Sequence, residues 1–130
     1  QVINAMTGCG GAEHDRARHA LRRLSSLAGD AAAALADGQV DPWAEVLVAS
    51  TEAQRDLHAG LVGAAHQAAI DVAASLGAAG WKVNGAGGDG GSLTVVAGAG
   101  GADELGAAVA AVDPTWRVLR LRCAEGLVVT

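Results

Sequence analysis

The chain has no phenylalanine and no tyrosine among its 130 residues, and three tryptophans are its only large aromatic residues. About half of the residues are nevertheless apolar, and most of these are Ala, Val and Leu. A core of such small side chains packs its helices closely but buries little apolar surface per residue. The length is that of one domain. We therefore expect a single packed domain of modest stability.

Cysteine is also scarce, and the two cysteines, Cys9 and Cys123, lie near opposite ends of the chain. They make no disulfide framework and neither has a second cysteine at metal-ligand spacing, so we expect reduced thiols in a cytoplasmic protein. No apolar run approaches the ~20 residues that span a bilayer, so no membrane partner is expected. Residues 1–5 resemble a cloning remnant before Met6, and the start lacks the pattern of a secretory signal.

Basic residues are too few to favour a nucleic-acid partner. Nine Lys and Arg face fourteen Asp and Glu, which gives a formal net charge of −5. The one basic cluster is typical of the solvated face of a helix; its members are Arg16, Arg18, His19, Arg22 and Arg23. His14 and His19 are five residues apart, which is a poor spacing for one helix face, and no Cys or acidic cluster completes a metal site. We expect no bound metal in this chain.

The first 80 residues have the periodicity of helices, because apolar residues recur at steps of three and four from Ala12 onward. Asp41 is expected to cap the second of three helices, with Pro42 in its first turn. Glycines mark the expected helix ends, at Gly38, at Gly60, and at Gly77 or Gly80. The expected inner faces are Leu21, Leu24, Ala28, Ala31, Ala32 and Leu35; Trp43, Val46, Leu47, Ser50 and Leu57; and Leu61, Ala65, Ala68, Ala69, Val72 and Leu76.

The pattern changes from helical to strand-like near Trp81. Asp103 begins a fourth helix, and the residues after Pro114 alternate between apolar and basic side chains, which predicts a half-buried strand. Three strands are expected in one sheet, residues 81–83, 93–97 and 116–123, with 127–129 as a last edge strand. Helices followed by the order β, β, α, β predict an α+β domain whose helices pack on one face of a small, mainly antiparallel sheet.

A glycine loop joins the first two expected strands: Gly85, Ala86, Gly87, Gly88, Asp89, Gly90 and Gly91. Glycine at this density costs conformational entropy, and it lets backbone N–H groups approach an anion such as phosphate. Gly85, Gly87 and Gly90 match the letters of the dinucleotide fingerprint, but a strand follows where that motif needs a helix. No Lys-Ser or Lys-Thr closes a P-loop. The plain alternative is a mobile hairpin turn.

Residues 81–92 resemble the third conserved motif of the GHMP kinases, the family of galactokinase and of homoserine, mevalonate and phosphomevalonate kinases. The matching positions are Gly80, Lys82, Gly85, Ala86, Gly87 and Gly88. Residues 51–58 and 69–71 are similar to the two helices that precede this motif in sugar kinases, particularly the heptose-phosphate and galactokinase-like members. The resemblance covers roughly residues 41–129.

The resemblance implies a ferredoxin-like C-terminal domain, whose missing N-terminal kinase domain would complete a cleft for ATP, Mg²⁺ and a sugar or sugar phosphate. The glycine loop would lie near the phosphates during phosphoryl transfer to a hydroxyl. Glu52, Arg55 and Lys82 are the candidates near the substrate. The alternatives are a surface ion pair for the first two and a lysine that extends along the strand surface for the third. No catalytic residue is expected in this chain.

The sequence departs from the family pattern at two points. Asp89 stands where the family usually has glycine, and a carboxylate there repels triphosphate unless it binds Mg²⁺ or a sugar hydroxyl or points away. The family's Ser/Gly-rich phosphate loop is absent. We therefore expect no kinase activity from this chain alone, weak nucleotide affinity, and self-association through the surface that meets the N-terminal domain. A stand-alone ferredoxin-like module that binds an anion or regulates without catalysis, and a structural dimerisation module, remain alternatives.

Overall fold

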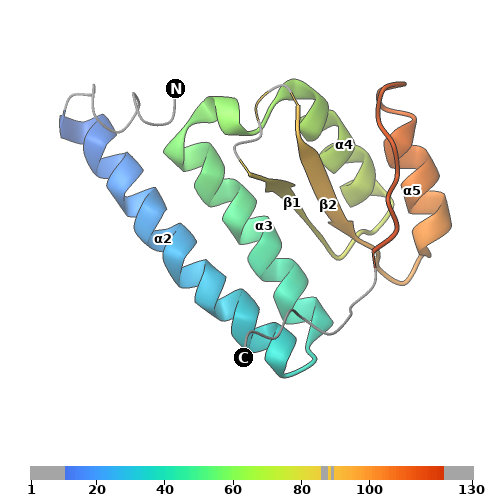
Figure 1. Ribbon diagram of the computed structural model, residues 1–130, viewed down its shortest axis with the longest axis horizontal. Helices are drawn as coiled ribbons and strands as arrows, with labels where there is room; N and C mark the ends of the chain where they lie inside the picture. Colours follow the sequence, from blue (N-terminus) through green and yellow to red (C-terminus); the bar gives the residue numbers. More distant parts are fainter. Residues whose placement is uncertain (1–10, 86–87, 89, 122–130) are drawn as a thin grey trace, which may run out of the picture.

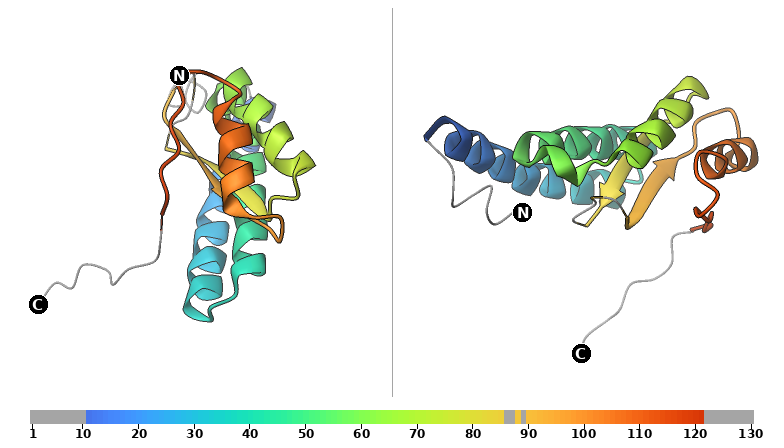
Figure 2. Two further views of the ribbon diagram at one scale, coloured as in Figure 1. Left: turned by 90° about the vertical axis from the view of Figure 1, so that its right-hand side faces the viewer. Right: turned by 90° about the horizontal axis from the view of Figure 1, so that it is seen from above.

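The computed structural model describes residues 11–85, 88 and 90–121, which form an α+β domain with a two-stranded antiparallel sheet. The elements are α2 (Gly11–Ala36), α3 (Val40–Leu57), the 3-10 turn η1 (Ala59–Leu61), α4 (Ala64–Ser75), β1 (Gly80–Asn84), β2 (Ser92–Val96) and α5 (Ala102–Ala110). In Figure 1, α2 and α3 lie side by side as an antiparallel pair. Figure 2 shows α2, α3 and α4 in one layer, with both strands on the same side of it.

Helix α2 packs on α3 through small side chains, as the composition predicts. Ala17 and Ala20 are buried against Leu57 and Leu61, with Leu21 and Leu24 partly buried beside them, and Ala34 is buried near the other end. The turn after α2 is a Schellman-type end. Gly38 takes a positive φ of 69°, and the N–H of Gln39 donates to the carbonyl of Ala34 at 2.9 Å.

The predicted inner face of α2 is partly wrong. Ala28, Ala32 and Leu35 are exposed, and Leu35 keeps 51 % of its surface. The stripe that faces α3 includes the predicted Leu24 and Ala31 and adds Ala34, so the contact overlaps the predicted face only in part. Periodicity predicts that this segment is a helix. It does not predict which side of the helix is buried, because alanines lie on several sides.

Helix α3 is the centre of the domain, because it contacts both α2 and β1. Its buried positions therefore surround much of its circumference: Ala44, Leu47, Ser50, Thr51, Ala53, Gln54 and Leu57. Of the expected inner face, Trp43 and Val46 are half-buried. The expected cap is wrong as well, since Gln39 is the N-cap and makes no side-chain cap bond, whereas Asp41 lies inside the first turn. A carboxylate there still favours the helix through its dipole.

Helix α4 begins at Ala64 rather than Leu61, because the preceding residues form η1. Its inner face includes His66, Ala69, Ile70 and Ala73, whereas the predicted Ala68 and Leu76 are exposed. Ile70 belongs to a second core cluster with Val62 and Val83, and Trp81 and Leu93 pack against that cluster. This cluster holds the hairpin of β1 and β2 to α4.

The two strands pair in the register Gly80↔Val96 to Asn84↔Ser92, close to the predicted strand positions. The expected third strand is not found in its described part, because residues 116–121 form no strand. Its apolar residues have no surface to cover: Leu119 and Leu121 keep 81 % and 82 % of their surface exposed. Trp116 instead lies near the ring of His66 on α4, with the ring centres 5.9 Å apart. The rest of that strand and the expected edge strand at 127–129 lie outside the described residues.

Candidate functional site

The glycine loop is closed at its base by side-chain hydrogen bonds. The amide nitrogen of Asn84, at the end of β1, donates to the hydroxyls of Ser92 and Thr94 on β2, at 3.0 and 2.9 Å. Gly85 and Gly91, the first and last residues of the loop, have positive φ angles of 63° and 87°. Such angles are unfavourable for other residues, so glycine is required where the chain leaves and re-enters the hairpin.

The middle of the loop lies against the start of α4. The N–H of Gly88 donates to the carbonyl of Leu61 at 3.3 Å, and Gly88 forms a parallel bridge with Val62. A Cβ at Gly63 would lie 2.3 Å from the carbonyl oxygen of Gly88, so only glycine allows this approach. Gly63 is the N-cap of α4, and its N–H donates to Nδ1 of His66 at 3.2 Å. The loop therefore lies at the positive end of the α4 dipole.

Lys82 and Gln54 form the polar centre beside the loop. The Lys82 ammonium donates to the side-chain carbonyl of Gln54 at 3.2 Å and to the backbone carbonyl of Val83 at 2.9 Å. The amide nitrogen of Gln54 donates in turn to the carbonyl of Gly85 at 3.3 Å. Lys82 has no carboxylate partner in the described part of the chain. Burial lowers its pKa below the ordinary value, because an ammonium is poorly solvated there.

Glu52 and Arg55 are brought together, but not with Lys82. The Nε of Arg55 donates to Glu52 at 3.1 Å, and its terminal nitrogen donates to the side-chain carbonyl of Gln67 on α4. Gln67 then donates to Asp71 at 2.7 Å. This chain of bonds ties α3 to α4, so the arginine contributes to packing between the helices. Among the described residues no hydrogen bond or ion pair joins this network to Lys82.

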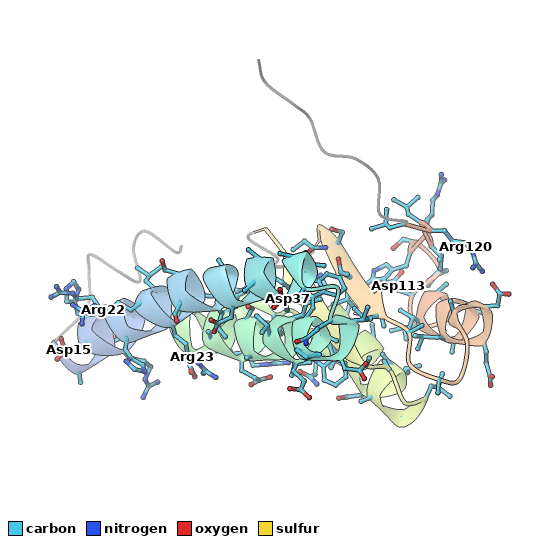
Figure 3. All side chains as sticks on the ribbon, turned by 90° about the horizontal axis from the view of Figure 1, so that it is seen from below. Asp15, Arg22, Arg23, Asp37, Asp113 and Arg120 are labelled. Atoms are coloured by element: carbon cyan, nitrogen blue, oxygen red, sulfur yellow. The ribbon has the colours of Figure 1, made fainter. Side chains whose placement is uncertain are left out.

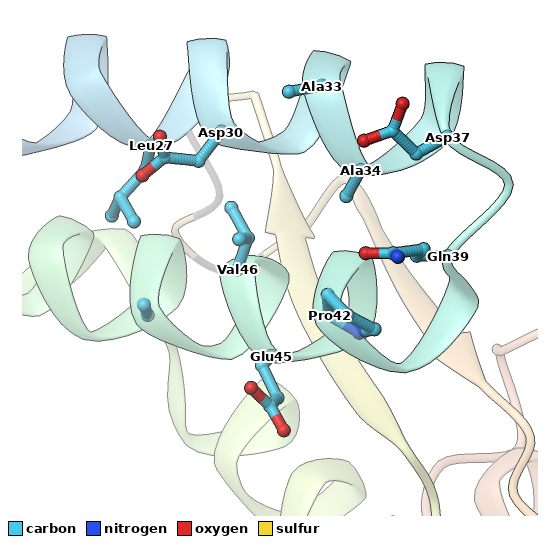
Figure 4. Close-up of a pocket in the computed structure, with 10 residues that line it drawn as sticks. Leu27, Asp30, Ala33, Ala34, Asp37, Gln39, Pro42, Glu45 and Val46 are labelled. Carbon is cyan, nitrogen blue, oxygen red and sulfur yellow. The ribbon is translucent and has the colours of Figure 1, made fainter.

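Ala86, Gly87 and Asp89 of the predicted loop lie outside the described residues. Its described members, Gly85, Gly88, Gly90 and Gly91, span the hairpin end between β1 and β2. No group of three or more His, Cys, Asp or Glu side chains in the described ranges is arranged to hold a metal ion. A surface groove lies away from the glycine loop, between α2 and α3 (Figure 4).

Sequence reasoning alone does not single out three positions that hold the hairpin and the loop in place. Gln54 is not distinguished from the other polar residues within residues 51–58, and Gly63 has no signal beyond being a glycine near a helix start. Thr51 is fully buried, and its hydroxyl lies 3.2 Å from the carbonyl of Leu47 and 3.3 Å from that of Trp81. For Thr51 and Gln54 the sequence does contain a signal, namely a polar residue between apolar positions of α3. Such a residue is expected to be buried with a hydrogen-bond partner, because buried polar groups need partners.

Comparison with models of protein families, with curated proteins and with solved structures finds no match to this chain. No helix of the described residues is long and apolar enough to cross a membrane. The candidate site is therefore defined by its own geometry: a glycine loop held at three points, a helix N-terminus beneath its middle, and a partly buried ammonium at its base.

Proposed function

We propose that the chain is the C-terminal domain of an ATP-dependent kinase of the GHMP type that phosphorylates a sugar or sugar phosphate. The observation that carries the proposal is the hairpin in which a glycine loop, anchored by Gln54 and by Leu61, follows the strand that contains Lys82. In the proposal, the loop lines the phosphate region of a cleft shared with an N-terminal kinase domain.

The chemistry of phosphoryl transfer suits this arrangement. The transferred group carries negative charge on its oxygens, and catalysis consists mainly of positioning and charge stabilisation. A glycine loop presents N–H groups without side chains in the way. The N-terminus of α4 lies against Gly88 of the loop, and the Lys82 ammonium binds Gln54, which binds Gly85, so both groups add positive potential near the loop. These groups support an anion near the loop, and the proposal assigns that anion to the phosphates of ATP or of the substrate.

The proposal leaves the reacting groups to the N-terminal domain. ATP and Mg²⁺ would bind mainly there, and Asp89 would face the cleft. Of the substrate-side candidates, we favour Lys82, because Arg55 already binds Glu52 and Gln67. The proposal also includes a ferredoxin-like sheet larger than the two strands described. An experimental structure of the full-length gene product tests that part.

The test of activity is a phosphorylation screen of the full-length gene product with Mg-ATP against sugars and sugar phosphates. We expect transfer to a hydroxyl of one class of acceptor. Lys82→Met should raise the KM for that acceptor or for ATP while the fold is kept. Absence of transfer to every acceptor, together with a gene that encodes no phosphate loop upstream, contradicts the kinase proposal.

A second candidate is a stand-alone anion-binding or regulatory module without catalysis. It is favoured by Lys82, whose ammonium is bound only by neutral carbonyl groups in the described part of the chain. Calorimetry of this chain with inorganic phosphate and with Mg-ATP separates the two candidates. Tight binding by the chain alone supports the module, whereas binding that appears only in the full-length product supports the kinase.

A further inference from the structure

We propose that the chain forms an antiparallel homodimer through one flank of α2. The flank carries a charge stripe, defined here as Arg16, Arg23, Asp30 and Asp37. These residues follow one another at intervals of seven, which is about two helical turns, so they lie along one side of the helix. All four are exposed. Asp37 directly follows the last residue of α2, and its N–H still donates to the carbonyl of Ala33 at 3.1 Å, as in the helix.

The charge stripe is complementary to itself in one direction only. It reads two cations and then two anions along the chain. When a second copy is laid antiparallel on it, Arg16 faces Asp37 and Arg23 faces Asp30. The two-fold axis repeats each pair, because a symmetric contact uses the same patch on both subunits. A parallel arrangement instead places like charges opposite each other.

The stability of α2 itself does not explain this order of charges. The helix dipole favours acidic residues near the N-terminus and basic residues near the C-terminus, yet Asp37 stands at the C-terminal end and the last turn has no basic residue. Arg16, Asp30 and Asp37 make no ion pair within the described part of the chain. Arg23 lies 3.9 Å from Asp56 on α3, and both side chains remain largely exposed.

A groove beside the stripe gives the second copy an apolar surface to cover. It runs between α2 and α3 and has three carboxylates, those of Asp30, Asp37 and Glu45 (Figure 4). Its apolar lining is Leu27, Ala33, Ala34, Pro42, Val46 and Ala49. The acidic groove of one copy fits the basic first half of α2 in the other copy. The groove of that other copy binds the first half of α2 from the first copy. Charge complementarity therefore selects a second copy of this chain as the occupant.

The location and size of this surface suit a dimer. In Figure 4 the strands lie behind the two helices, and in Figure 3 Arg23 points to the side of α2 away from the strands. The surface is therefore separate from the glycine loop. A helix of 26 residues is about 39 Å long, and two helices side by side are about 20 Å wide. The contact can therefore approach the ~800 Å² per partner of a standard interface.

The test is sedimentation equilibrium of this chain at about 50 mM and about 1 M salt, since exposed ion pairs are screened by salt. We expect a dimer that weakens at high salt. The variants Asp30→Arg with Asp37→Arg, and Arg16→Asp with Arg23→Asp, each make the stripe uniformly charged. Either should raise the dimer dissociation constant at least about tenfold. An equimolar mixture of the two variants should form a heterodimer, detected by native mass spectrometry.

The matched control reverses two arginines on another side of the same helix, Arg18→Asp with Arg22→Asp. Figure 3 shows Arg22 and Arg23 pointing to different sides of α2. This control should dimerise like the wild type. The stripe variants move acidic residues toward the N-terminus and basic ones toward the C-terminus, so the dipole favours their helix, and circular dichroism checks it. A wild-type monomer at all concentrations, a dimer that persists in both stripe variants, or a mixture that forms no heterodimer overturns the proposal.

Discussion

At the scale of single residues, the sequence identifies the loop and Lys82 but not the side chain that connects them. Gln54 lies 31 residues before Gly85, and nothing local in the chain indicates that its amide bonds both the loop and the ammonium. Such a bond depends on how α3 lies over β1. The Glu52–Arg55 ion pair, by contrast, could be anticipated, because residues three apart on a helix are neighbours.

We predict that Lys82 titrates below its ordinary pKa of 10.5, because burial disfavours its charged form. Lys82 is the only lysine, so one side-chain amine signal in a pH titration by NMR reports it directly. At pH values between the lowered pKa of the folded chain and 10.5, Lys82 keeps its proton in the unfolded chain but loses it in the folded one. Over this pH range the unfolding free energy of the wild type should therefore rise with pH relative to that of Lys82→Met. A pKa at or above 10.5 contradicts this prediction.

Gln54→Leu should lower the unfolding free energy by about 1–3 kcal/mol, because the Gly85 carbonyl and the Lys82 ammonium each lose a buried partner. Gln54→Glu is the matched control, since it keeps the shape and adds a carboxylate. It should raise the pKa of Lys82 relative to the wild type. Denaturant unfolding and the NMR titration measure the two effects. An unchanged pKa in Gln54→Glu shows that the two side chains do not meet.

At the scale of secondary-structure elements, periodicity locates the helices and the hairpin, but it does not decide which alternating segment becomes a strand. Residues 116–121 alternate as a strand should, yet form none in the structure, because alternation needs a sheet edge and an apolar surface to bury. Similarly, Ala28 and Ala32 look like core residues only because alanine is abundant throughout α2. Burial is decided by the neighbouring elements, which a single helix pattern does not contain.

The contact between the loop and α4 depends on Gly63, and we predict that Gly63→Ala loosens it. The φ of Gly63 is −73°, which alanine accepts, so the effect is purely steric: the new Cβ meets the Gly88 carbonyl at 2.3 Å. We expect a loss of about 1–3 kcal/mol of unfolding free energy and faster amide exchange at Gly88.

The matched control for this steric effect is Gly29→Ala in α2, where a Cβ meets nothing within 4 Å. Alanine has the higher helix propensity, so the control should raise the unfolding free energy by up to about 1 kcal/mol. Hydrogen exchange and denaturant unfolding of both variants give the comparison. Equal protection of Gly88 in Gly63→Ala and in the wild type excludes the steric contact.

At the scale of the whole molecule, the domain has two separate surfaces. The glycine loop lies at the hairpin end beside α4, whereas the charge stripe lies along α2, beside the groove between α2 and α3 and on the face away from the strands. Association through the stripe should therefore leave the loop accessible to a ligand or to another domain. The affinity of the chain for an anion should not depend on the dimer equilibrium.

We expect this chain alone to show no phosphoryl transfer with Mg-ATP and any sugar, and no more than weak nucleotide affinity. Transfer requires the triphosphate, the metal and the acceptor hydroxyl to be held together in line. The described residues supply a loop and an ammonium but no group that orients a hydroxyl beside them. Calorimetry and a coupled turnover assay are the measurements. Turnover would mean that the chain is a complete catalytic unit, whereas micromolar binding of Mg-ATP without turnover would support the stand-alone anion-binding module.

The single lysine also gives the site a distinct chemical reactivity. A lowered pKa increases the fraction of Lys82 present as the free amine near neutral pH, and the free amine is the nucleophile. An aldehyde or an activated ester should therefore modify the side chain of one residue, next to the loop, without competition from other lysines. The rate of that labelling therefore reports whether the site is occupied, because an anion bound at the loop should slow the reaction of Lys82.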